Sequence, residues 1–159
     1  MFDLVCGVSA GGWVALGIRA SVRPAKMIDL FKTMAAKVFD KGWNLSRIVF
    51  GGARYDSDKL SNLASEYFGE GSIIGEKSYS FVVSRTNLGD TPFLWCHYEA
   101  PPATLQFDGK PGGLYPDLAL STMKSAALAT SAAPTFFSPV TVPVFILFCG
   151  FSGVGPYFK

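Results

Sequence analysis

The feature that most constrains this chain is a serine set among very small residues close to its start. The segment reads FDLVC, then GVSAGG, then WVALGIRAS, so a turn of small residues separates two apolar runs. A short apolar run ending at glycine is typical of a strand buried on both faces. The second run predicts a helix packed on a sheet through its apolar residues, Val14, Leu16, Gly17 and Ile18. Strand, turn and helix together indicate an α/β fold.

The turn itself, GVSAG at residues 7–11, fits the G-x-S-x-G pattern of serine hydrolases. Such a turn strains the serine backbone, so Gly7 and Gly11 suit the positions two residues either side, and Gly12 allows the helix to approach the strand. The helix N-terminus, from Ala10 onward, directs free N–H groups and a positive dipole toward the place where an oxyanion would form. We therefore predict that Ser9 is a nucleophile; the alternative is a structural serine in a turn.

The same segment lies where a secretory signal peptide would lie. Such a peptide starts with basic residues and continues into an unbroken apolar core. Here the start carries Asp3 and no basic residue, and SAGG interrupts the apolar stretch. We therefore expect no signal peptide, and a location in the cytoplasm or peripherally on a membrane.

Composition excludes several classes of function. The chain has 159 residues, 49% of them hydrophobic and 16% charged, which favours one well-buried α/β domain or some membrane contact. Its net charge is +2 without a basic run, so nucleic acid is not an expected partner. Cys6, Cys96 and Cys149 are too widely spaced for a disulfide framework or a zinc site, and we expect buried thiols. His97 is the only histidine, which excludes a histidine-rich metal site.

Periodicity predicts the elements between the two ends of the chain. Helices are expected over 23–40, over 55–69 with Asp56 or Ser57 as the cap, and from Leu118 until Pro134. Residues 78–87 and 93–100 read as two strands of a hairpin, and residues 101–117 as a loop. The first two helices carry apolar stripes, formed by Met27, Leu30, Phe31, Met34 and Val38, and by Leu60, Leu63, Ala64, Tyr67 and Phe68.

A second distinctive segment is ALATSAAPTFF, residues 127–137. Together with GVSAGG it resembles the catalytic domain of the patatin-like phospholipases, which carry G-x-S-x-G on a strand–turn–helix and later a helix ending in A-x-A-T-S-A-A-P-T-x-F. The resemblance covers about residues 2–140, so we expect a partial patatin-like domain over 1–140 and a divergent apolar tail over 141–159. The apolar run in that tail, VPVFILFCGF, is too short for a membrane span, which needs roughly twenty residues, and predicts a buried strand.

The resemblance implies a three-layer α/β/α fold with a nucleophile elbow, and hydrolysis of acyl esters in phospholipids or acylglycerols. No metal or cofactor is expected, and peripheral membrane contact would suit the substrate. Ser9 corresponds to the family's nucleophile and Gly7 and Gly11 to its flanking glycines. The family's general base is an aspartate of an Asp-Gly-Gly or Asp-Gly-Ala motif that follows the small-residue run, and a glycine-rich loop upstream of the nucleophile completes its oxyanion hole.

The chain departs from this pattern at both ends. The last acidic residue is Asp117, before the small-residue run, and only Met1 precedes the nucleophile strand. Two alternatives for the base remain open: Asp108, in the only Asp-Gly pair, and a triad of Ser9 with Asp90 and His97. We therefore expect weak or no turnover by these 159 residues alone; the alternative is an inactive lipid-binding or regulatory fragment.

Overall fold

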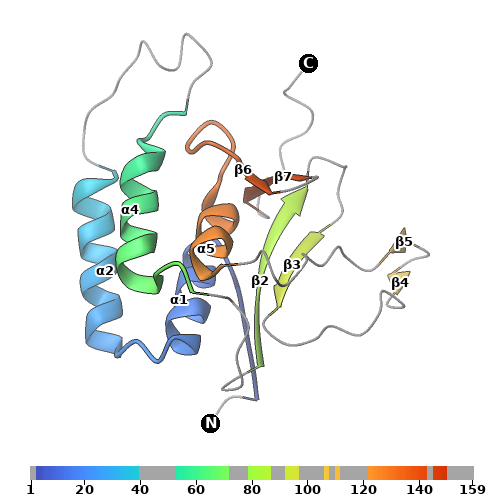
Figure 1. The fold of residues 1–159 in the computed structure, drawn as a ribbon, viewed down its shortest axis with the longest axis horizontal. Coiled ribbons are helices and arrows are strands. Elements are labelled where there is room, and N and C mark those ends of the chain that lie inside the picture. The colour runs from blue at the N-terminus through green and yellow to red at the C-terminus, as the bar shows by residue number, and fades with distance from the viewer. Residues whose placement is uncertain are drawn as a thin grey trace.

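A mixed sheet stands beside a group of helices in the computed structural model, which describes residues 3–39, 53–71, 79–86, 92–96, 106–107, 110–111, 122–142 and 145–149 (Figure 1). The described helices are α1 (Ala10–Arg19), α2 (Pro24–Lys37), α4 (Ser57–Phe68) and α5 (Met123–Ser131). The described strands are β1 (Leu4–Val8), β2 (Tyr79–Thr86), β3 (Pro92–Cys96), β4 (Gln106–Phe107), β5 (Lys110–Pro111), β6 (Val140–Val142) and β7 (Phe145–Cys149). The expected α/β class is confirmed.

Strand β2 organises the sheet, because β1, β3 and β7 all pair with it. The β1–β2 pairing is parallel and places Gly7 beside Val82, whereas the pairings with β3 and β7 are antiparallel. The predicted pairing of residues 78–87 with 93–100 is thus confirmed as β2–β3, with its turn outside the described residues. Strands β4 and β5 form a separate short ladder within the predicted loop.

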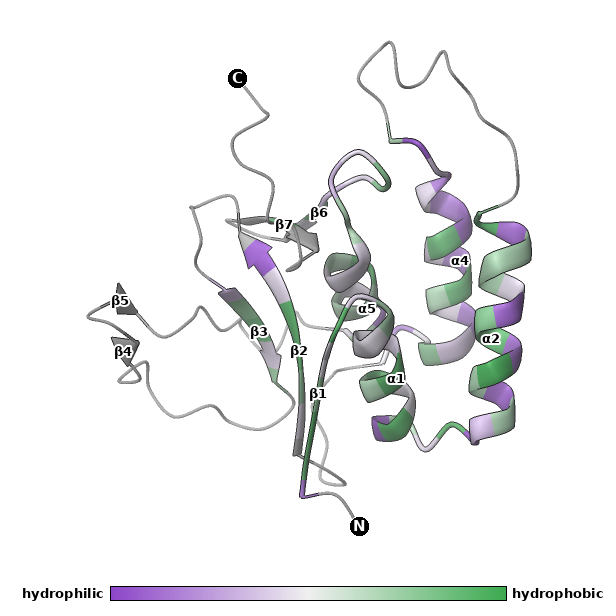
Figure 2. Cartoon of the chain, turned by 180° about the vertical axis from the view of Figure 1, so that it is seen from behind, coloured by the Kyte–Doolittle hydropathy of each residue, from purple (hydrophilic) through white to green (hydrophobic). Residues whose placement is uncertain are grey.

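The described helices lie on one side of this sheet (Figures 1 and 2). Strand β1 therefore turns only alternate side chains toward them: Val5 packs on the core, while Leu4 is 53% exposed and Cys6 is exposed. The prediction that this strand is buried on both faces is wrong, and so is the prediction of a buried Cys6. Cys96 is buried as predicted, and the surroundings of Cys149 lie outside the described residues.

Helices α2 and α4 lie side by side (Figure 2), and the two predicted apolar stripes contribute to one core cluster. All members of the two stripes are buried except Phe31 and Tyr67, which are partly buried. The Asp56 carboxylate caps α4 by accepting the N–H of Asp58 at 3.0 Å, and Gly69, with φ 66°, ends the helix. Periodicity and capping residues thus predict this pair of helices well.

Helix α1 presents a different face to the core from the one predicted. Val14 and Ile18 are 41% and 45% exposed, and the buried residues are Gly12, Trp13, Ala15, Leu16 and Gly17. Gly12 lies against Val82 of β2 and Thr130 of α5, and Gly17 lies against Met27 of α2. With these two glycines turned inward, Val14 and Ile18 face outward. The predicted apolar face of α1 is therefore wrong at these two positions.

The C-terminal elements bring the apolar tail into the sheet. Helix α5 begins at Met123 rather than at Leu118, because the Thr122 hydroxyl caps it by accepting the N–H of Ser125 at 3.0 Å; residues 118–121 lie outside the described residues. The predicted strand in the apolar run is confirmed as β7, whose Leu147 is fully buried. The division at residue 140 stays a prediction.

Candidate active site

Ser9 occupies the junction between β1 and α1. Its backbone has φ 55° and ψ −127°, a combination that non-glycine residues rarely adopt and that costs about 1–3 kcal/mol. Ser9 is also the N-cap residue of α1, yet its side chain makes no capping hydrogen bond. The hydroxyl is therefore not used for the local task that a serine at this position usually performs.

The glycines around Ser9 differ in how strictly they are required. A Cβ on Gly7 would overlap the backbone carbonyl of Gly11, and a Cβ on Gly12 would lie 2.8 Å from Cγ2 of Thr130 and 3.0 Å from Cγ1 of Val82. A Cβ on Gly11 would meet nothing within 4 Å. The predicted need for small residues is thus confirmed at Gly7 and Gly12, whereas no steric need exists at Gly11.

The two motifs at opposite ends of the chain meet at Ser9. Its backbone N–H donates to Oγ1 of Thr130 at 2.7 Å, although the two residues are 121 positions apart. Thr130 is fully buried, and its hydroxyl in turn donates to the carbonyl oxygen of Val83 at 2.8 Å. The small-residue run of α5 therefore holds the turn at Ser9 against strand β2.

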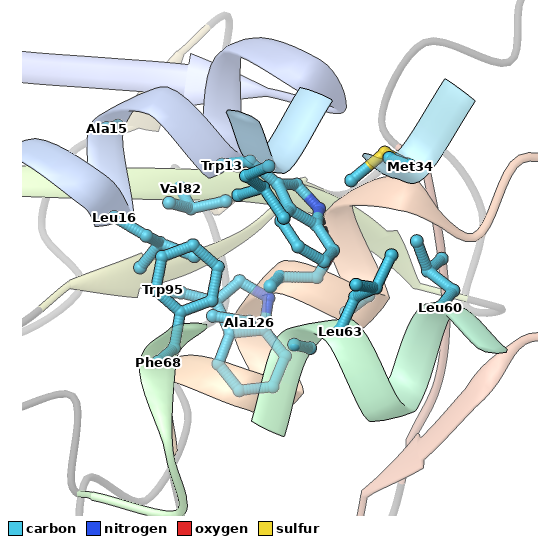
Figure 3. Close-up of a cluster of buried hydrophobic side chains, with 14 of the residues drawn as sticks. Trp13, Ala15, Leu16, Met34, Leu60, Leu63, Phe68, Val82, Trp95 and Ala126 are labelled. Atoms are coloured by element: carbon cyan, nitrogen blue, oxygen red, sulfur yellow. Dashed lines mark hydrogen bonds between the residues drawn. The ribbon is translucent and has the colours of Figure 1, made fainter. Parts of the chain in front are cut away.

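Trp13 forms a second connection between the same two motifs. Its indole Nε1–H lies 2.7 Å from Oγ of Ser131 and 3.1 Å from the carbonyl oxygen of Ala127, and both accept from it. The ring is fully buried and lies 5.3 Å from that of Phe68, within the apolar cluster shown in Figure 3. Trp13 thus ties the first turn of α1 to α5 and to α4.

The N-terminus of α1 provides hydrogen-bond donors beside Ser9. The first intrahelical bond of the turn runs from the N–H of Trp13 to the carbonyl oxygen of Ser9 at 3.2 Å. The N–H groups of Ala10, Gly11 and Gly12 precede it and have no partner within the helix. With the positive end of the helix dipole they form a setting that stabilises an anion. Since the N–H of Ser9 already binds Thr130, the donors nearest to Ser9 are those of Ala10 and Gly11.

The candidate bases Asp108, Asp90 and His97 lie outside the described residues. A carboxyl group with a shifted pKa lies elsewhere: the Lys124 ammonium, 2.7 Å away, lowers the pKa of Glu70 through its hydrogen bond. This pair joins the end of α4 to the first turn of α5, whereas Ser9 contacts the last turn. Within the described part of the chain, no group of three or more histidine, cysteine or acidic side chains gathers as a metal site would require.

Thr130 and Ser131 are site residues that the sequence analysis did not single out. Both belong to the ATSAAP run that carries the family resemblance, so this run was the only feature of the sequence that pointed to them. Their roles depend on contacts across more than a hundred residues, which a pattern along the chain does not reveal.

Fold and site together define a mixed α/β domain with a G-x-S-x-G segment at the turn from a strand into a helix. The model of the family described as patatin-like phospholipase matches residues 1–145. The chain belongs to the patatin-like phospholipase family.

Several curated proteins are similar to this chain. A cGAMP-activated phospholipase of Pseudomonas aeruginosa is 32% identical over 142 residues, and the match covers 86% of this chain and 38% of that protein. A protein of the same description from Vibrio cholerae is 29% identical, with 87% of this chain and 38% of the relative covered. A patatin-like phospholipase 1 of Plasmodium falciparum is 27% identical, with 85% and 19% covered. The chain thus spans well under half the length of these relatives.

Among the helices that the structure describes, none is long and apolar enough to cross a membrane.

Proposed function

We propose that this chain carries the nucleophile of a lipid acyl hydrolase, acting on phospholipids or acylglycerols in lipid breakdown, and that the nucleophile is Ser9. The observation that carries the proposal is the positive φ of Ser9 in the turn between β1 and α1, combined with a hydroxyl that does not cap the helix. Strained serines between a strand and a helix are the nucleophile elbows of α/β hydrolases. Membership of the patatin-like phospholipase family supports the choice of an acyl ester as substrate.

In the proposed reaction, Oγ of Ser9 attacks the ester carbonyl carbon while its proton passes to a general base. The carbonyl oxygen becomes an oxyanion, which the N–H groups of Ala10 and Gly11 would stabilise at the start of α1. The ester C–O bond then breaks, the alcohol leaves with the proton, and the acyl group stays on Ser9. Water, deprotonated by the same base, attacks the acyl-enzyme and releases the fatty acid and free serine.

The family resemblance places the general base after the small-residue run, but no acidic residue follows Asp117 in this sequence. Removing one member of a catalytic unit commonly lowers the rate by several orders of magnitude. We therefore expect slow turnover from the 159-residue polypeptide by itself. The same observation favours a second candidate function, an inactive fragment that binds lipid or regulates a longer relative.

A fluorophosphonate probe followed by peptide mapping tests the nucleophile directly. We expect slow labelling of the wild type on Ser9 and none in Ser9→Ala. Ser21→Ala is a matched control, since Ser21 is another serine with φ 55° but lies beyond the end of α1. Equal labelling of wild type and Ser9→Ala would contradict the proposal.

Two further measurements separate the candidate functions. Hydrolysis of a short-chain ester that disappears in Ser9→Ala supports the hydrolase, whereas binding to phospholipid vesicles without any hydrolysis supports the inactive fragment. Peripheral membrane contact is part of both candidates. Val14 and Ile18, one turn apart on α1, are exposed apolar side chains that would contribute to such a contact.

A further inference from the structure

We propose that Thr130 is a positioning residue for Ser9, acting through the backbone N–H of Ser9 rather than on the substrate. This inference rests on the proposed function, since it concerns how the nucleophile is held. It is drawn from one buried hydroxyl that joins three separate elements: α5, strand β2 and the turn between β1 and α1.

The two hydrogen bonds of Thr130 fit the bonding capacity of a hydroxyl. Oγ1 accepts the N–H of Ser9 at 2.7 Å and gives its single proton to the carbonyl oxygen of Val83 at 2.8 Å. Val83 is the direct neighbour of Val8 in the parallel pairing of β1 and β2, so this acceptor lies beside the end of the strand that leads into Ser9. The hydroxyl therefore connects the end of β1 to the turn that follows it.

Both branches of the Thr130 side chain face Gly12, where an added Cβ would lie 3.0 Å from Oγ1, and the methyl branch comes closer still. Cγ2 of Thr130 lies against Gly12, where an added Cβ would come within 2.8 Å of it. The β-branched side chain thus packs its methyl group on α1 and presents its hydroxyl to Ser9. One rotamer makes both contacts, and it is held by the two hydrogen bonds of the hydroxyl together with the packing on Gly12.

This arrangement explains how an unfavourable backbone conformation persists at Ser9. Strained residues keep their conformation only where several surrounding contacts determine it together. The covalent connections to β1 and α1 define the two sides of the turn, and the bond to Thr130 defines the direction of the Ser9 N–H. Without the hydroxyl, this N–H would lose its partner at the turn, and the position of the Ser9 side chain would be less well defined.

Two variants of Thr130 separate the hydroxyl from the methyl group. Thr130→Val keeps the branched shape that packs on Gly12 and removes both hydrogen bonds; Thr130→Ser keeps the hydroxyl and removes the methyl group. We expect Thr130→Val to label with the fluorophosphonate about tenfold to a hundredfold more slowly than wild type, and Thr130→Ser to stay within about threefold of it. Thermal melting of each variant is measured in parallel.

A purely structural role predicts a different pattern, in which labelling rates follow melting temperatures whichever group is lost. The inference is overturned if Thr130→Val labels as fast as wild type, or if Thr130→Ser slows labelling as much as Thr130→Val does. Equal labelling of wild type and Ser9→Ala would instead contradict the proposed function, because Ser9 would then not be the nucleophile that Thr130 positions.

Hydrogen exchange of the Ser9 amide provides a test that needs neither labelling nor a stable Thr130→Val. We expect the amide of wild-type Ser9 to exchange at least about tenfold more slowly than an unprotected peptide amide, and to keep this protection in Thr130→Ser. Exchange of wild-type Ser9 at the unprotected rate would contradict the inference even if Thr130→Val does not fold.

Discussion

The contact between α2 and α4 and the contact between α1 and α5 are built in opposite ways. Helices α2 and α4 contribute long apolar side chains such as Leu30 and Leu63 to one buried cluster. Helices α1 and α5 meet through small residues, with Gly12 against Thr130, and through hydrogen bonds from Ser9 and Trp13. The α2–α4 contact stabilises the domain, whereas the α1–α5 contact also determines where the backbone nitrogen of Ser9 lies.

This difference matters because catalysis and stability respond to different errors in position. An apolar contact loses stability gradually as side chains shift, since dispersion and burial are summed over many atoms. A nucleophile displaced by about 1 Å loses about a hundredfold in rate. A contact made by small residues and directional hydrogen bonds restricts such displacement more strictly than packing of flexible side chains does.

The largest loss of stability is expected for a substitution at Gly7, in the closely packed turn that leads into α1. In Gly7→Ala the new Cβ overlaps the backbone of Gly11, which cannot move without disrupting the start of α1. We expect unfolding to become easier by more than about 4 kcal/mol, or no folded protein at all, as measured by urea denaturation.

Gly11→Ala is the matched control, because its Cβ meets nothing within 4 Å. At this exposed helical position alanine should stabilise the chain by about 0.5–1 kcal/mol. If Gly7→Ala were as stable as Gly11→Ala, the close packing of the turn against α1 would be wrong.

A smaller loss of stability, confined to the α2–α4 contact, is expected for Leu30→Ala on α2. Leu30 is fully buried, and its truncation leaves a cavity that should cost about 2–4 kcal/mol in urea denaturation. The surviving folded protein should label at Ser9 at the wild-type rate, because α2 does not hold the turn. Ile28→Ala, on the exposed side of the same helix, should change stability by less than about 0.5 kcal/mol. Slower labelling in folded Leu30→Ala would show that the two contacts are not independent.

The same contrast explains what could be predicted from the sequence. The stripes of α2 and α4 repeat every three or four residues, so their buried positions could be read directly along the chain. The face of α1 could be read only in part: Leu16 and Gly17 are buried as predicted, whereas Val14 and Ile18 are exposed. Hydropathy does not predict a buried Gly12, which faces inward because α1 approaches Val82 and Thr130 closely there.

The candidate site was predictable to the same limited extent. The GVSAG segment and its strand–turn–helix context identified Ser9 and its turn, because both are local features. The hydroxyl of Thr130 and the acceptors of Trp13 come from a helix more than a hundred residues away. No periodicity along the chain specifies such a contact; it depends on how β2 places α1 and α5 side by side on the sheet.

The smallest of the three losses of stability is expected for Trp13→Phe, which changes the α1–α5 contact itself. Phenylalanine keeps an aromatic ring against Phe68 but removes the indole N–H that Ala127 and Ser131 accept. We expect a loss of about 1–3 kcal/mol in urea denaturation. Ser131→Ala, the matched control, should lose less, because the Nε1–H keeps the Ala127 carbonyl oxygen as an acceptor.

The rate at which the probe labels Ser9 in Trp13→Phe then shows whether Trp13, as well as Thr130, positions Ser9. If Thr130 alone orients the nucleophile, folded Trp13→Phe labels within about threefold of wild type despite its lower stability. A decrease as large as that of Thr130→Val would mean that Trp13 also positions Ser9, and that the whole contact acts as one unit. In either case the stability lost and the rate lost are measured on the same protein, so packing and positioning are separated within a single pair of helices.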